Sequence, residues 1–169
     1  MPWTNWIFVG PKGGSRPDNP GFVHAFHLQP DGQWLLEQII TPHDAQHHDA
    51  FGHNIVMSQG RALIAANCED GGHGNPASSN VSVYLFELGQ NDSWEQVEVF
   101  RSPDRRKYDP DGNDLFFGFG YFLIGSAGLD GIKGQRAKDI GALYVYRAAA
   151  ALRSTPPVQG DPVELRRDS

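Results

Sequence analysis

The 169-residue chain contains one cysteine, Cys68, and has no long apolar run. A single cysteine excludes an intramolecular disulfide framework and cannot form a cysteine-based zinc site by itself. No stretch approaches the roughly 20 apolar residues of a membrane-spanning helix. Residues 1–20 lack the basic start and apolar centre of a signal peptide, so none is predicted.

Basic residues are scarce as well: 14 Lys and Arg stand against 20 Asp and Glu, for a formal net charge of −6. Phosphate binding requires clustered Lys and Arg, so neither a nucleic acid nor an anionic membrane is expected as a partner. The one basic run, residues 105–107, lies between Asp104 and Asp109 and is interpreted as a solvated loop. In contrast, the 20 Gly and 12 Pro are typical of a turn-rich β protein.

The most informative positive feature is a repeat of sixty residues. Phe26, Phe86 and Tyr146 are sixty residues apart, and Trp34 precedes Trp94 by the same interval. The same spacing relates Asp44 to Asp104, Asp49 to Asp109, Gly52 to Gly112, Gly60 to Gly120 and Ile64 to Ile124. A fixed period of this size indicates an array of like supersecondary units. Residues that keep the register are therefore interpreted as structural, and residues that break it as better functional candidates.

Each repeat is predicted to be a four-stranded antiparallel meander. The most complete copy has β-like segments at residues 52–57, 61–66, 81–88 and 94–100, bounded by turn residues. In the last segment, Trp94, Gln96 and Glu98 alternate with Glu95, Val97 and Val99, as in a half-buried strand. Residues 6–10, 21–28 and 34–40 correspond to the second to fourth strands of an earlier copy. Residues 113–117, 121–126 and 141–147 correspond to the first three strands of a later copy, with a poor fourth strand around 162–165.

Four-stranded units of about this length are typical of β-propeller blades. The predicted fold is all-β, with about three blades: residues 1–43 form a partial blade, 44–103 a full blade and 104–153 a partial blade. Residues 154–169 are a tail or a poor last strand. Three blades would leave two outer sheet faces exposed. We therefore expect either a partial ring completed by homo-oligomerisation or a chain that is part of a longer one.

Several short motifs resemble the FG-GAP repeat of integrin-α-type β-propellers. They include Asp49-Ala50-Phe51-Gly52, Leu63-Ile64-Ala65-Ala66 and Val83-Tyr84-Leu85-Phe86, and the resemblance extends over roughly residues 6–147. It implies a ligand-binding or adhesion module at an extracellular or cell-surface location. Members of this family often carry a calcium cage between the first and second strands. Here those connections, residues 58–60 and 118–120, are too short and too poor in carboxylates to enclose a calcium ion.

A different acidic cluster is the best calcium candidate. Asp109, Asp111 and Asp114, together with Asn113, supply the oxygen ligands that calcium prefers, but in another loop. The alternative for Asp109, and for Asp44, Asp49 and Asp104, is a structural role, because short acidic side chains in turns accept backbone N–H bonds. Four histidines in one interblade region, His43, His47, His48 and His53, could likewise bind a metal or simply be part of a polar loop.

The long connections are expected to share one face of the molecule, because alternate connections of an antiparallel meander emerge on the same side. They are residues 11–20, 41–50, 67–80, 102–112 and 127–140. Binding residues are commonly carried on such loops. The candidates on this face are Glu69, Asp70, His73, Asp130 and Lys133.

Three functions stay open from the sequence. The first is a non-catalytic recognition or adhesion module that binds a glycan or a protein. The second is a propeller-type hydrolase or lyase that uses Glu69, Asp70, His73 or Asp130 as acid and base, although no nucleophile motif accompanies them. The third is a partial propeller with an assembly role only. Trp34 and Trp94 keep the register and are interpreted as packing anchors in preference to sugar platforms.

Overall fold

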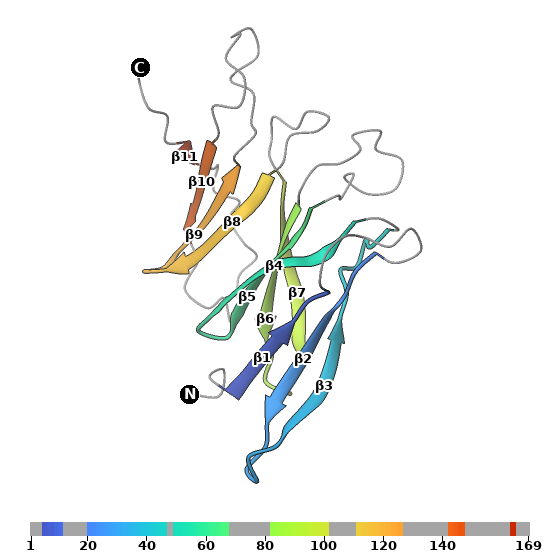
Figure 1. The fold of residues 1–169 in the computed structure, drawn as a ribbon. Coiled ribbons are helices and arrows are strands. Elements are labelled where there is room, and N and C mark those ends of the chain that lie inside the picture. Colours follow the sequence, from blue (N-terminus) through green and yellow to red (C-terminus); the bar gives the residue numbers. More distant parts are fainter. Residues whose placement is uncertain are drawn as a thin grey trace, which may run out of the picture.

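The computed structural model describes residues 5–11, 20–46, 49–67, 82–101, 111–126, 142–147 and 163–164. These residues form three antiparallel sheets (Figure 1). The first sheet contains β1 (Trp6–Val9), β2 (Val23–Leu28) and β3 (Trp34–Ile40). The middle sheet contains β4 (Phe51–Ser58), β5 (Arg61–Ala66), β6 (Ser82–Leu88) and β7 (Trp94–Arg101). The third sheet contains β8 (Asp111–Gly118), β9 (Tyr121–Ser126), β10 (Ala142–Arg147) and the short β11 (Val163–Glu164).

The predicted strands are confirmed in kind and order. The first sheet has the order β1-β2-β3, and the middle sheet has the order β4-β5-β6-β7. The third sheet has the order β11-β10-β9-β8, so its last strand is the two-residue segment at 163–164, within the predicted poor strand. Within the part of the chain that the structure describes, the three sheets do not form a closed ring.

The sixty-residue period is exact in the hydrogen-bond register. The β2–β3 ladder shifts between Ala25 and Phe26, and the β6–β7 ladder shifts sixty residues later, between Leu85 and Phe86. The β4–β5 ladder shifts between Phe51 and Asn54, and the β8–β9 ladder between Asp111 and Asp114. A bulge re-aims the side chains beyond it. Equivalent residues of two sheets therefore lie on equivalent faces.

One expectation for β7 is wrong for this reason. Strict alternation would place Glu98 on the face of Trp94, but the bulge changes the phase of the strand after Gln96. Glu98 pairs with Leu85, whose side chain belongs to the core between the middle and third sheets. Val99 instead packs against the core that contains Trp94.

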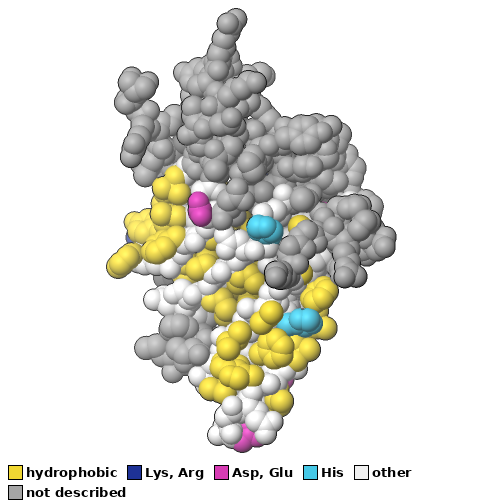
Figure 2. Space-filling view, in the orientation of Figure 1, with side chains coloured by type: hydrophobic (Ala, Val, Ile, Leu, Met, Phe, Trp, Pro, Cys, Tyr) yellow, Lys and Arg dark blue, Asp and Glu magenta, His cyan; other side chains and the backbone are white. Residues whose placement is uncertain are grey.

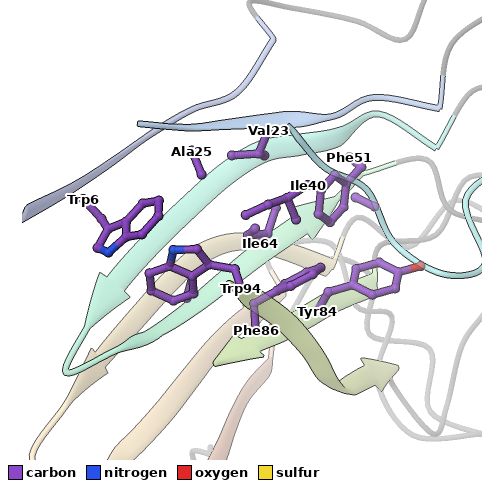
Figure 3. Packing of buried hydrophobic residues seen from close by; sticks show 11 residues of the cluster. Trp6, Val23, Ala25, Ile40, Phe51, Ile64, Tyr84, Phe86 and Trp94 are labelled. Carbon is purple, nitrogen blue, oxygen red and sulfur yellow. The ribbon is translucent and has the colours of Figure 1, made fainter. Parts of the chain in front are cut away.

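The middle sheet is covered on both faces. We call the face directed toward the first sheet its N-side face, and the face directed toward the third sheet its C-side face. Ala62, Ile64, Tyr84, Phe86 and Trp94 of the N-side face pack against the first sheet (Figure 3). The first-sheet residues in that core are Trp6, Val23, Ala25 and Ile40.

The C-side face of the middle sheet forms a second core with the third sheet. Leu63, Ala65, Val83, Leu85 and Phe100 come from the middle sheet. Phe117, Phe122, Ile124 and Tyr144 come from the third sheet, on the face equivalent to the N-side face of the middle sheet. The same two kinds of face therefore meet at both junctions.

Glycine permits the close approach of the first two sheets. A Cβ atom at Gly10 would lie 2.1 Å from the carbonyl oxygen of Gly52, and Gly52 itself has φ of 91°. Gly21, with φ of 92°, forms a parallel bridge to Phe51. A side chain at these positions would separate the backbones or require a strained conformation.

The two ends of the sheets differ in their connections. Gln59 and Gly60, with φ of 53° and 74°, join β4 to β5, and Phe119 and Gly120, with φ of 52° and 78°, join β8 to β9. Positive φ at both central residues is the mark of a two-residue type I′ turn, whose twist matches that of the strands. The connections between β2 and β3 and between β6 and β7 are also short. The long connections that follow β1, β3, β5, β7 and β9 begin and end at the opposite end (Figure 1). The connection between β10 and β11 is also long but starts at the tight-turn end, where Arg147 pairs with Tyr121.

No helix among the described residues is long and apolar enough to cross a membrane.

Candidate functional site

The first candidate region is the end of the sheets at which the long connections attach. The strand termini that define it are Val9, Ile40, Ala66, Arg101 and Ser126, together with the starts of β2, β4, β6, β8 and β10. The candidates Glu69, Asp70, His73, Asp130 and Lys133 lie outside the described residues. The framework of this end is thus described, whereas these five side chains stay predictions.

The acidic cluster proposed for calcium is described only in part. Asp109 lies outside the described residues, and Asp111 is the first residue of β8. Asp114 is exposed on β8, next to the bulge that follows Asp111. No group of three or more His, Cys, Asp and Glu side chains that could hold a metal ion occurs within the described ranges.

Two acidic residues that keep the register have structural contacts. The buried side chain of Asp49 accepts a hydrogen bond from the backbone N–H of Gln46 at 2.6 Å. Asp44 forms a salt bridge with Arg101 at the end of β7. The Asp49 contact lies within the connection between β3 and β4, whereas the Asp44 salt bridge attaches this connection to β7. Both contacts agree with the structural interpretation of these residues.

Two of the four histidines of the first interblade region lie within the described residues. His43 and His53 are exposed, whereas His47 and His48 lie outside the described residues. The backbone N–H of His43 donates to Oε1 of Gln96 at 2.9 Å, which attaches this connection to β7. The contact involves the backbone of His43, so it does not require an imidazole.

The two register tryptophans have opposite environments. Trp94 is 2% exposed and forms edge contacts with Trp6 and Phe8, at ring-centroid distances of 5.8 and 4.8 Å. This confirms its prediction as a packing anchor. Trp34, at the equivalent position of the first sheet, is 41% exposed. The packing interpretation of Trp34 is therefore wrong for the chain as described, because no sheet covers it.

Trp34 belongs to a second candidate region, the N-side face of the first sheet. On this face Ile7, Val9, Trp34, Leu36 and Ile39 are exposed. Figure 2 shows hydrophobic side chains gathered over β1, β2 and β3, with a histidine among them. His24 lies between Phe22 and Phe26, with ring centroids 4.9 and 6.1 Å apart. Exposed apolar surface of this kind is common at interaction sites, which makes this face a candidate.

The C-side face of the third sheet is the third candidate region. Phe116 and Tyr121 are exposed there, and Leu123, Leu143 and Val145 are half-buried. Figure 2 shows a second group of hydrophobic side chains over β8 and β9. The middle-sheet equivalents of Leu123, Leu143 and Val145 are Leu63, Val83 and Leu85, all of which are buried.

A polar link joins the first and middle sheets. Gln38 donates from Nε2 to the carbonyl oxygen of Trp94 at 2.9 Å, and the backbone N–H of Trp94 donates to Oε1 of Gln38 at 2.8 Å. The amide can do both because it carries a donor and an acceptor. Sixty residues later stands Glu98, and burial raises the pKa of its carboxyl group.

Comparison with known families gives one match. The model of the FG-GAP repeat matches residues 34–86, and this segment is an FG-GAP repeat. It extends from β3 of the first sheet to β6 of the middle sheet, so the sequence repeat crosses a junction between sheets. No curated protein and no solved structure gives a significant match.

Sequence reasoning overlooked the contacts that join the sheets. The reciprocal Gln38–Trp94 link and the Asp44–Arg101 salt bridge both span more than fifty residues. The only sign of such contacts in the sequence is the sixty-residue register. For the Gln38–Trp94 link, it relates Gln38 to Glu98, a residue of similar shape. The exposed N-side face of the first sheet was expected in general terms, but its residues were not named.

Proposed function

We propose that the three sheets are consecutive blades of a β-propeller segment that acts as a non-catalytic recognition module for a protein or a glycan. The observation that carries this proposal is the asymmetry of the connections. Tight turns close one end of the sheets, and the long connections that follow β1, β3, β5, β7 and β9 all attach at the other, whereas the β10–β11 connection starts at the tight-turn end. Ligand-binding residues are commonly carried on long connections held by a rigid scaffold. The FG-GAP repeat at residues 34–86 supports the blade assignment.

The residues proposed for recognition are Glu69, Asp70, His73, Asp130 and Lys133, which lie between β5 and β6 and between β9 and β10. They carry both signs of charge and one imidazole, so they suit a polar ligand such as a hydrophilic protein surface or a sugar. The two connections occupy equivalent positions in neighbouring sheets, since β5 and β9, and likewise β6 and β10, are related by the sixty-residue register.

Binding to glycan and protein arrays tests this proposal. The wild-type chain is expected to bind at least one arrayed glycan or protein reproducibly. Substituting Glu69, Asp70 and His73 together by alanine is expected to weaken its binding by about tenfold or more, since truncating central contact residues typically has this effect. Gln90→Ala is the matched control, because Gln90 is exposed on the short turn between β6 and β7 at the opposite end.

Two results would overturn the recognition role or its location. The first is the absence of binding above background by any oligomeric form of the chain. The second is a ligand whose affinity falls with Gln90→Ala and not with the triple substitution. The second result would move the site to the short-turn end.

A second candidate function, assembly through sheet faces, is favoured by the exposure of Trp34 and Tyr121. It does not compete with ligand recognition, because it uses the sheet faces and not the ends of the strands.

A further inference from the structure

We propose that a second copy of this chain docks head to tail, with the C-side face of its third sheet on the N-side face of the first sheet. The inference rests on the proposed blade arrangement but not on the ligand proposed for the long-connection end. Both faces are rich in exposed apolar side chains, and the chain already contains two junctions between faces of these two kinds.

The register identifies the first sheet's exposed face as one that another sheet covers. Trp34, Phe26 and Ile39 are equivalent to Trp94, Phe86 and Val99 of the middle sheet. All three middle-sheet residues belong to or pack against the core between the first and middle sheets. The exposed fraction of the tryptophan falls from 41% at Trp34 to 2% at Trp94. The same side chain at the equivalent position is thus exposed in the first sheet and buried in the middle sheet, which the first sheet covers.

The register also identifies the sheet that fits there. In the first junction the covering face presents Val23 and Ala25, and in the second it presents Val83 and Leu85. The equivalent residues of the third sheet are Leu143 and Val145, and they lie on its outer face. A second copy therefore offers the same kind of surface that covers the N-side face twice within the chain.

One aromatic contact can be named. Trp94 packs on Trp6 and Phe8 of β1. Trp6 pairs with His27 in the first sheet, and Tyr121 pairs with Arg147 in the third sheet. His27 and Arg147 are two sixty-residue periods apart. Tyr121 and Leu123 are therefore the equivalents of Trp6 and Phe8. In the head-to-tail contact, Trp34 of one copy packs against Tyr121 and Leu123 of the other. Tyr121 is 43% exposed in the single chain.

Such a contact is heterologous: it joins two different surfaces, so each copy keeps one of each. Two copies close into a ring if the rotation between sheets permits, and otherwise the contact continues into longer assemblies. Removal of the two apolar faces from water supplies the driving force.

Sedimentation equilibrium and light scattering of the 169-residue chain test the proposal. The wild type is expected to have at least twice the 18.6 kDa mass of one copy, in a concentration-dependent manner. Trp34→Glu and Tyr121→Glu, separately, are each expected to weaken association by at least about tenfold. Phe119→Glu is the matched control: Phe119 is 96% exposed at a hairpin tip, outside both faces, and this variant is expected to associate like the wild type.

Mixing the two variants distinguishes head-to-tail docking from pairing of like faces. Trp34→Glu keeps an intact third-sheet face and Tyr121→Glu keeps an intact first-sheet face. An equimolar mixture is therefore expected to form a 1:1 dimer that grows no further. Thermal unfolding of each variant shows whether it is folded, and near-wild-type melting is expected for both.

Four outcomes would overturn the proposal. They are a wild type that stays monomeric at all concentrations, loss of association by only one of the two variants, equal loss with Phe119→Glu, and a mixture that does not dimerise. If either variant does not fold, Trp34→Gln and Tyr121→Gln replace them in the same measurements. Array binding with unchanged monomeric mass would contradict this inference and leave the recognition proposal intact, whereas dimers that bind nothing would do the reverse.

Discussion

At the scale of single residues, Gln38 and Glu98 show how one atom changes the chemistry of an equivalent position. Gln38 both donates to and accepts from the backbone of Trp94. An ionised carboxylate can only accept hydrogen bonds. At Glu98, burial disfavours the charged form and raises the pKa of the carboxyl group. A half-buried glutamate is thus less favourable at neutral pH than the amide at the equivalent position.

This difference predicts a pH-dependent effect of Glu98→Gln. Because the folded-state pKa of Glu98 is raised, the folded state binds the proton more tightly than the unfolded chain. Its contribution to stability is fully present below the ordinary pKa of 4.5 and is lost as pH rises through the raised folded value. Glu98→Gln is therefore expected to raise the free energy of unfolding at pH 7 and to have less effect at pH 4.

Urea unfolding at both pH values measures this effect. Glu95→Gln is the control, since Glu95 is exposed on the same strand. A stability gain from Glu98→Gln that is the same at pH 4 and pH 7 would show that the effect does not arise from titration of this carboxyl group.

At the scale of elements, the two type I′ turns differ in how well their residues suit positive φ. Gly occupies the second central position in both turns, at Gly60 and Gly120. The first central position holds Gln59 in one turn and Phe119 in the other, with φ of 53° and 52°. A bulky aromatic residue is rarely found with positive φ, whereas Asn-Gly is the preferred pair for this turn. Phe119 therefore strains its turn and buries almost nothing in return.

Phe119→Asn is expected to stabilise the chain by about 0.5–1 kcal/mol, because asparagine tolerates the left-handed region. Thermal and urea unfolding measure the gain. Phe119→Ala is the matched control: it also removes the exposed ring but does not favour positive φ, so no comparable gain is expected. If alanine stabilises as much as asparagine, the exposed ring and not the backbone is the source of the effect.

Much of each element was predictable, and the failures have a common origin. Hydrophobic runs and turn residues located the strands because those signals are local. The predicted alternation of side chains in β7 is wrong beyond Gln96, because the bulge in the β6–β7 ladder depends on pairing between strands. The long-connection end followed from antiparallel topology, whereas the inter-sheet contacts of Gln38 and Asp44 did not, since they join positions more than fifty residues apart.

At the scale of the whole molecule, the central position of the middle sheet predicts an order of stability. Its two faces are both covered, whereas the first and third sheets each have an exposed face. Local opening is easiest where few apolar contacts hold a segment. The Trp34→Glu variant is used at a concentration at which it is monomeric, so that no second copy covers either outer face. In this variant, amides of β5 and β6 are expected to exchange with solvent more slowly than those of β1 and β10. Hydrogen exchange by NMR measures this order, and equal or slower exchange in β1 would contradict it.

Calcium binding by Asp109, Asp111 and Asp114 is also tested on the whole chain. A bound ion stabilises the folded state by mass action, so excess calcium is expected to raise the melting temperature by roughly 5 °C over a chelator. Asp111→Asn together with Asp114→Asn is expected to abolish the shift. Asp92→Asn, an exposed acidic residue on a short turn, is the control. Equal melting with calcium and with chelator would remove this proposal.

The sequence by itself determined the period, the strands, their antiparallel order and the FG-GAP repeat at residues 34–86. These follow from local hydrophobic patterns and turn chemistry, which each unit repeats. Only the tertiary structure decided that Trp94 is buried and Trp34 is exposed, although both keep the register. Burial depends on whether a neighbouring sheet is present, and the sequence of a single repeat does not contain that information.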